Sequence, residues 1–197
     1  MKTFLHVGCG PVEQWQLKGF ASYDWTELRF DIDPAVLPDI EGTLTDMKAV
    51  PTASVDAVYS SHNLEHVYPH EVPLVLAEFH RVLKDKGFVV LTCPDLVSVA
   101  AAVAEGRVLE PLYESPAGPI SALDVLYGHR AAMAAGNLYM AHRTGFSYAT
   151  LQAAFAEAGF RLHVGAARPE HLDLWIVAFK GDVSPEEANP IALTYLP

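Results

Sequence analysis

Apolar positions along the chain follow two different periods, which predicts alternating strands and helices. Short apolar runs, each closed by glycine, proline or small polar residues as buried strands are, lie at 4–9, 28–32, 55–60 and 88–93. The segment 71–84 is instead helical in pattern, with an apolar face made of Val72, Val75, Leu76, Phe79, Val82 and Leu83. This alternation favours an α/β fold with a doubly wound, mainly parallel sheet and helices on both faces.

The second half of the chain departs from simple alternation. A helix is predicted over 148–158, and two apolar runs at 161–167 and 172–180 follow it with a short connection, which indicates antiparallel pairing at a sheet edge. The segment 97–147 is longer than a crossover needs, so we expect an insert that acts as a lid. Residues 1–180 then form one domain, and 181–197 form an irregular, proline-spaced tail.

Composition excludes several classes of protein. The 197 residues are 51% apolar and carry a net charge of −11, so the basic surface that dominates nucleic-acid affinity is absent. No apolar run approaches a membrane span, and no signal peptide is recognisable, so we expect a cytoplasmic protein without a membrane partner. The apolar group at 191–193 leaves a homodimer open.

The first chemical signal is a pair of glycines after the first predicted strand. Gly8 and Gly10 allow a tight turn and close approach of a ligand to the backbone, and Asp31 ends the second strand at the spacing of a residue that binds a ribose. Glu13 stands where a dinucleotide motif has its third glycine, which disfavours a dinucleotide cofactor.

Several motifs together resemble the class I S-adenosylmethionine-dependent methyltransferases, in the compact group with an LEH signature after the fourth strand. The motifs, which span roughly residues 4–180, are LHVGCGP, FDIDP, TDM, SVDAVYSSHNLEHV, EFHRVLKDKGFVVLTCPDL and SYATLQAAFAEAGF. The resemblance implies a Rossmann-like, three-layered fold whose seven-stranded sheet has an antiparallel strand at its edge. It also implies S-adenosylmethionine as the cofactor and, as we expect here, a small-molecule acceptor.

The resemblance also implies roles for individual residues. Gly8 and Gly10 would pass under the methionine part of the cofactor and Asp31 would hold the ribose. The other residues expected at the cofactor are His6, Asp46, Met47, Ser60 and Ser61, with Asp46 and Met47 at the adenine. His6 stands where the family has an acid and Val12 where it has a glycine. These two departures motivate an alternative, a protein of the same fold that binds the cofactor or a related nucleoside without turnover.

A second alternative reads His62–His66 (HNLEH) as a zinc-hydrolase motif. That motif needs both histidines on one face of a stable helix. An apolar strand runs up to Ser60 and Pro69 follows closely, so we expect no metal.

Methyl transfer needs a base only when the acceptor arrives protonated. Histidine titrates near neutral pH, so the candidate bases are His62, His66, His129 and His142, with His62 first by position. Tyr127 and Arg130 in the insert are the residues expected to orient the substrate.

Overall fold

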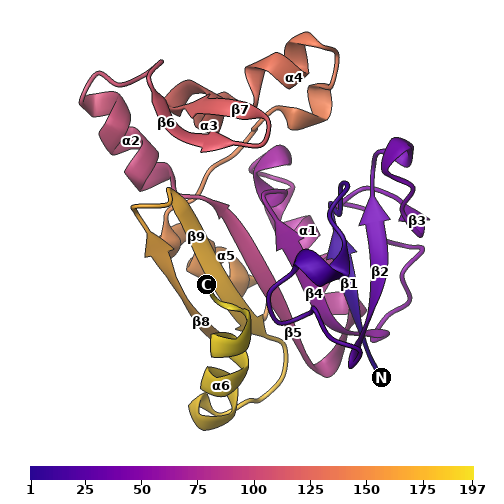
Figure 1. The fold of residues 1–197 in the computed structure, drawn as a ribbon. Helices are drawn as coiled ribbons and strands as arrows, with labels where there is room; N and C mark the ends of the chain where they lie inside the picture. Colours follow the sequence, from indigo (N-terminus) through magenta and orange to yellow (C-terminus); the bar gives the residue numbers. More distant parts are fainter.

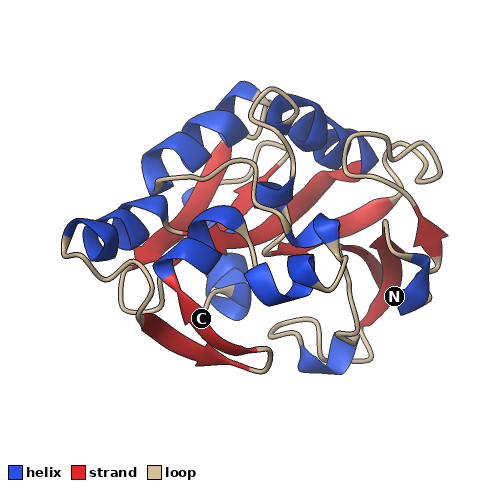
Figure 2. Cartoon of the chain, turned by 90° about the horizontal axis from the view of Figure 1, so that it is seen from above, coloured by secondary structure: helices blue, strands red, loops and turns tan.

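A seven-stranded sheet with helices on both faces organises the molecule. The computed structural model describes residues 1–197, and its strand order is β3-β2-β1-β4-β5-β9-β8 (Figures 1 and 2). The sequence therefore predicted correctly a Rossmann-like, doubly wound and mainly parallel sheet in three layers.

The strands of the large sheet are β1 (Lys2–Val7), β2 (Trp25–Asp31), β3 (Ile40–Glu41), β4 (Val55–Ser61), β5 (Leu83–Pro94), β8 (Leu162–Arg168) and β9 (Asp173–Phe179). A separate hairpin consists of β6 (Pro111–Ser115) and β7 (Gly118–Ser121). The α-helices are α1 (Val72–Val82), α2 (Leu96–Ala104), α3 (Ala122–Tyr127), α4 (Arg130–Ala134), α5 (Tyr148–Glu157) and α6 (Pro185–Tyr195). Short 3₁₀ turns are η1 (Gln14–Gln16), η2 (Pro34–Val36), η3 (Leu64–His66) and η4 (Leu138–Met140).

The parallel strands bring three sequence segments to one edge of the sheet. Val7 of β1 pairs in register with Phe30 of β2 and Ser60 of β4, so these strands end at the same level. The loops that follow them are therefore neighbours. In an open α/β sheet this carboxyl edge is where ligands bind.

The antiparallel strand lies one position inside the edge that we predicted for it. β9 runs antiparallel between β5 and β8, and β8 forms the edge. Burial explains the order, because nearly all of β9 is buried whereas β8 is only partly buried along its length. The more apolar run takes the position that has a partner on both sides.

Successive side chains along each strand point to opposite faces of the sheet and pack into two separate cores. Val58 of β4 faces a core that includes Leu76 of α1 and Phe155 of α5, while its neighbour Tyr59 faces the opposite core. That second core is aromatic and contains Phe20, which stacks on Phe4 at 4.2 Å between ring centroids. Each buried aromatic or aliphatic side chain contributes roughly 1.5–3 kcal/mol.

The C-terminal tail is helical, which corrects our expectation of an irregular segment. Ser184 and Glu187 form a capping box that begins α6, and Pro185 occupies the first turn, where proline is tolerated. Ala192 is fully buried against the aromatic core, whereas Leu193 is 72% exposed. Of the apolar residues 191–193, which suggested a surface for a homodimer, only Leu193 is exposed, and the other two pack within the chain.

The insert is also folded, and it lies beyond the carboxyl edge of the sheet (Figure 1). Its hairpin and helices surround a small apolar cluster made of Val99, Ile120, Ala122 and Val125. Its last residues return to the sheet: the backbone N–H groups of Arg143 and Thr144 donate to the carbonyl of Glu65 at 2.8 and 3.2 Å.

Two further boundaries differ from expectation. The third strand is only two residues long, and the chain after it turns back through a single bridge between Thr43 and Asp46. The helix before β5 ends at Val82, because the chain passes directly from α1 into the strand. No helix combines the length and the apolar character that crossing a bilayer requires.

Candidate functional site

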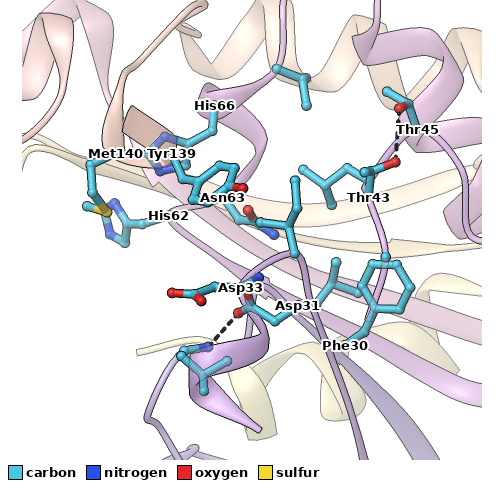
Figure 3. A pocket seen from close by; sticks show the side chains of 18 of the residues that line it. Phe30, Asp31, Asp33, Thr43, Thr45, His62, Asn63, His66, Tyr139 and Met140 are labelled. Atoms are coloured by element: carbon cyan, nitrogen blue, oxygen red, sulfur yellow. Dashed lines mark hydrogen bonds between the residues drawn. The ribbon is translucent and has the colours of Figure 1, made fainter. Parts of the chain in front are cut away.

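A cavity of about 450 Å³ opens at the carboxyl edge of β1, β2 and β4. Its size is that of a pocket for a small organic ligand. Figure 3 shows His62, His66 and Tyr139 on one side of it and Asp31 and Asp33 below them. It is lined by Val7, Gly8, Gly10, Pro11, Phe30, Asp31, Ile32, Asp33, Val36, Gly42, Thr43, Leu44, Thr45, His62, Asn63, His66, Val67, Glu71, Asn137, Tyr139, Met140 and Arg143.

The glycine loop forms one wall of the cavity. Gly8 and Gly10 have φ of +65° and +50°, a region that glycine enters without steric penalty. A Cβ on Gly8 would lie 2.3 Å from the Asn63 side chain, so this close approach also requires glycine. Nothing lies within 4 Å of a Cβ built on Gly10, which leaves space there for a ligand.

The Asp31 carboxylate is held rigidly at the end of β2. One oxygen accepts a hydrogen bond from the Gly10 N–H at 2.8 Å, and the other accepts from the Asp33 N–H at 2.9 Å. A carboxylate oxygen has two acceptor positions, so each retains one for a ligand hydroxyl. This arrangement is suited to a diol.

The Asn63 amide nitrogen is an unpaired donor beside Gly8. It is buried and has no hydrogen-bond partner within the protein. A buried donor without a partner is destabilising, so a ligand acceptor at this position would be favourable. With the glycine wall and the free acceptor positions of Asp31, the cavity fits a nucleoside whose polar substituent reaches Asn63.

Glu65 lies behind the cavity at the centre of a histidine cluster. Its side chain is 2% exposed, and the Nδ1 atom of half-exposed His62 lies 3.5 Å from Oε1. Burial disfavours the carboxylate, but His62, His66 and His142 outweigh it and the pKa of Glu65 is lowered. Partial removal of His62 from water disfavours its charged form, but the nearby Glu65 carboxylate outweighs this and raises the pKa of His62. Because the His62 ring is half-exposed, solvent weakens its attraction to Glu65.

His142 lies on the other side of this cluster. Burial lowers its pKa, although Glu65 opposes that shift. His142 and Glu65 line a second, smaller cavity of about 190 Å³, together with Tyr127 and Arg143. Arg143 lines both cavities, so the two lie side by side.

The structure brings five of the predicted residues to the large cavity, namely Gly8, Gly10, Asp31, His62 and His66. Tyr127 and His142 line the small one. The remaining predicted residues line neither cavity: His6, Asp46, Met47, Ser60, Ser61, His129 and Arg130.

Each of these misplacements has a physical reason. His6 points into the protein, where its Nδ1 lies 2.6 Å from Glu27 Oε1. Met47 is fully buried in the core, and Asp46 faces solvent with Lys48. Thr43–Thr45 line the wall at which we expected these two residues.

Ser60 is fully buried within the sheet, and Ser61 ends the same strand. In the insert, Arg130 is held by Asp124 at 2.7 Å, and His129 precedes α4. Neither Arg130 nor His129 lines either cavity.

The zinc-hydrolase interpretation of HNLEH is wrong in its geometry. Only Leu64–His66 is helical, as one 3₁₀ turn, and His62 lies before it at φ +48°. The two histidines of the motif therefore do not lie one turn apart on an α-helix, which that signature requires.

Sequence reasoning assigned no role to Tyr139 or Arg143, and it named Asn63 only as a member of the polar cluster that follows the strand. Tyr139 and Arg143 reach the cavity only because the insert folds back over it, which no local pattern indicates.

Comparison with known proteins agrees with the resemblance that the motifs carry. Residues 5–91 match a family model described as a methyltransferase domain. Over these residues the chain is similar to that family, in agreement with the motifs. No curated protein matches it significantly in sequence.

Solved structures show the same fold. An S-adenosylmethionine-dependent methyltransferase from Methanosarcina mazei is 16% identical, with a TM-score of 0.60 over 91% of this chain and 92% of that one. One from Archaeoglobus fulgidus is 16% identical, with a TM-score of 0.57 over 91% and 86%. The first three matched structures are covered over 62%, 92% and 86% of their length.

A third example was solved with ligands. The 1,6-didemethyltoxoflavin-N1-methyltransferase of Burkholderia thailandensis, bound to 1,6-didemethyltoxoflavin and S-adenosylhomocysteine, is 15% identical. Its TM-score is 0.56 over 92% of this chain and 72% of that one.

Proposed function

We propose that this protein transfers a methyl group from S-adenosylmethionine to a small-molecule acceptor. The observation that carries the proposal is the wall formed by Gly8, Gly10 and Asp31, whose carboxylate keeps two acceptor positions free toward the cavity. The neighbouring protein from B. thailandensis has S-adenosylhomocysteine bound, which supports the same cofactor class here.

In this proposal the chain supplies binding and alignment. Asp31 binds the ribose hydroxyls, the glycine loop lies against the methionine part, and Thr43–Thr45 contact the adenine. The cofactor supplies a sulfonium-activated methyl group, so the protein needs chiefly to align a nucleophile and exclude water.

The acceptor then enters from the side of the insert. His62 faces the large cavity, and His142 and Tyr127 line the adjoining smaller one. We assign to His62 the role of hydrogen-bonding the acceptor, because its ring is half-exposed at the wall opposite Asp31. A cavity of about 190 Å³ and a net charge of −11 both favour a small acceptor over a nucleic acid. Two buried free cysteines suit a reducing cytoplasm.

Calorimetric titration of the full chain with S-adenosylhomocysteine tests the cofactor, and transfer of a labelled methyl group to a panel of small molecules tests the activity. We expect saturable binding with one site per chain. Absence of binding at millimolar concentration of either cofactor form would overturn the proposal. Binding without transfer to any acceptor would favour the alternative of a binding protein.

A further inference from the structure

Glu65, His66 and His142 converge from segments far apart in sequence. Their nearest oxygen and nitrogen ligand atoms all lie within 4.8 Å of one another. The backbone hydrogen bonds from Arg143 and Thr144 to the Glu65 carbonyl hold the end of the insert against η3 and so fix this convergence.

Backbone carbonyls orient both imidazole rings. The Nδ1 atom of His66 lies 3.1 Å from the Ala141 carbonyl, and that of His142 lies 2.7 Å from the Val125 carbonyl. A carbonyl only accepts hydrogen bonds, so each Nδ1 donates and each Nε2 keeps its lone pair. Metal-binding histidines are typically fixed in this way.

The Glu65 carboxylate accepts no hydrogen bond, and the half-exposed His62, whose Nδ1 lies 3.5 Å from Oε1, carries a charge only when it is protonated. Both of its oxygens are buried and have no hydrogen-bond partner. The Arg143 guanidinium donates to the His66 carbonyl and lies over the Tyr68 ring, so it is not paired with Glu65. A buried carboxylate without such partners is costly, and a bound cation would offset that cost.

We propose that Glu65, His66 and His142 bind one divalent cation of the Zn²⁺ class between the two cavities. Two imidazole nitrogens and one carboxylate oxygen are a donor set that suits Zn²⁺, whereas Mg²⁺ and Ca²⁺ prefer oxygen ligands alone. Three protein ligands leave a coordination position open. This site differs from the helical HNLEH motif, because His142 replaces His62 as a ligand.

The open coordination position of the proposed cation would lie between the two cavities, where the methyl acceptor can reach it. His66 lines the large cavity, and Glu65 and His142 line the small one. An oxygen or sulfur atom of the methyl acceptor would reach the cation there, and the cation would favour its deprotonated form. This last step rests on the proposed function, whereas the cation site itself does not.

The test uses the full chain, stripped with a chelator and titrated with Zn²⁺ by calorimetry. Co²⁺ in place of Zn²⁺ gives an absorption spectrum that reports the ligand geometry. We expect one cation per chain. His142→Ala and the isosteric Glu65→Gln should each weaken binding about tenfold or more. His171→Ala, which removes an exposed histidine outside both cavities, is the matched control and should bind as the parent does.

Circular dichroism of each variant first establishes that it is folded. The proposal is overturned if the folded parent binds no Zn²⁺ at micromolar concentration, or if His142→Ala and Glu65→Gln bind it unchanged. Tighter binding of Mg²⁺ than of Zn²⁺ would overturn the assigned class of cation. Because no cofactor is present in this titration, it gives its answer whether or not S-adenosylhomocysteine binds.

Discussion

The Asp31 carboxylate accepts a 2.8 Å hydrogen bond from the Gly10 N–H and so ties the ends of β1 and β2 together. The Arg29 guanidinium strengthens the connection by donating to the Gly10 carbonyl at 2.6 Å. The glycine loop is therefore positioned before any ligand arrives. Preorganisation of this kind reduces the entropy that is lost on binding.

The first prediction concerns this carboxylate. Asp31→Ala removes two acceptor positions that face the cavity, and hydrogen bonds to a charged group contribute about 1.5–3 kcal/mol each. We expect the affinity for S-adenosylhomocysteine to fall roughly a hundredfold or more, as measured by calorimetric titration. Asp85→Ala, at an exposed position in β5, is the control and should bind as the parent does. An unchanged affinity in Asp31→Ala would remove Asp31 from the site.

The second prediction separates steric from conformational requirements in the glycine loop. Gly8→Ala forces a Cβ into Asn63 and also strains φ, so we expect a loss of about 2–4 kcal/mol in the free energy of unfolding. Gly10→Ala meets nothing within 4 Å and should lose only about 1–2 kcal/mol. Denaturant titration measures both.

Gly106→Ala supplies the reference for these two variants. Gly106 has φ +84° with nothing within 4 Å of a Cβ, and it lines neither cavity. It should match Gly10→Ala in stability but bind S-adenosylhomocysteine normally, whereas Gly10→Ala binds it more weakly. Equal unfolding free energies of Gly8→Ala and Gly10→Ala would show that the Asn63 side chain can move away from the added methyl group without destabilising the protein.

Local pattern was sufficient to predict the centre of the fold. The apolar run at 55–60 and the helical face over 71–84 are each decided by neighbouring residues, and both elements formed close to their predicted bounds. Helix α6 was missed because Pro185 and Pro190 interrupt its pattern, and proline within a helical pattern is a signal for its end. Its stability comes from Ala188 and Ala192, which are buried in the aromatic core, and from Tyr195, whose ring packs on Phe20 and Phe88 far away in sequence.

In the candidate site, too, local pattern predicted the positions that follow strands but not those that depend on contacts between distant segments. Gly8, Gly10 and Asp31 were predictable because each directly follows a strand, and the carboxyl ends of parallel strands meet. The placement of His142 beside Glu65 depends on an insert that returns across 77 residues, through hydrogen bonds between backbone groups that carry no sequence signature. His6 lines neither cavity because its ring lies against Glu27, a partner that its position in the strand did not reveal.

The third prediction follows from the buried His6–Glu27 pair. Burial lowers the pKa of His6 and outweighs the opposing effect of Glu27, so the folded protein takes up a proton on this ring at lower pH than the unfolded chain does. Stability therefore falls as the pH decreases below the ordinary value of 6.5. In His6→Gln this contribution is absent.

Denaturant titration between pH 7.5 and pH 5 measures the contribution of His6 to the pH dependence of the unfolding free energy. We expect the unfolding free energy of His6→Gln to change less over this range than that of the parent, even though the variant is less stable throughout. Identical pH dependence in the two proteins would mean that folding does not lower the pKa of His6.

The last prediction concerns the two free thiols. Cys9 is 1% exposed and burial raises its pKa to about 11, and burial also raises the pKa of fully buried Cys93 well above its ordinary value. A thiol reacts as its thiolate, and at pH 8 only about one Cys9 in a thousand is ionised. We expect neither thiol to react with a disulfide reagent within minutes in the native protein, and both to react in denaturant, as followed by absorbance. Because Cys9 lies between Gly8 and Gly10, rapid native labelling of Cys9 alone would mean that the glycine loop opens without a ligand, which contradicts the preorganised wall described above.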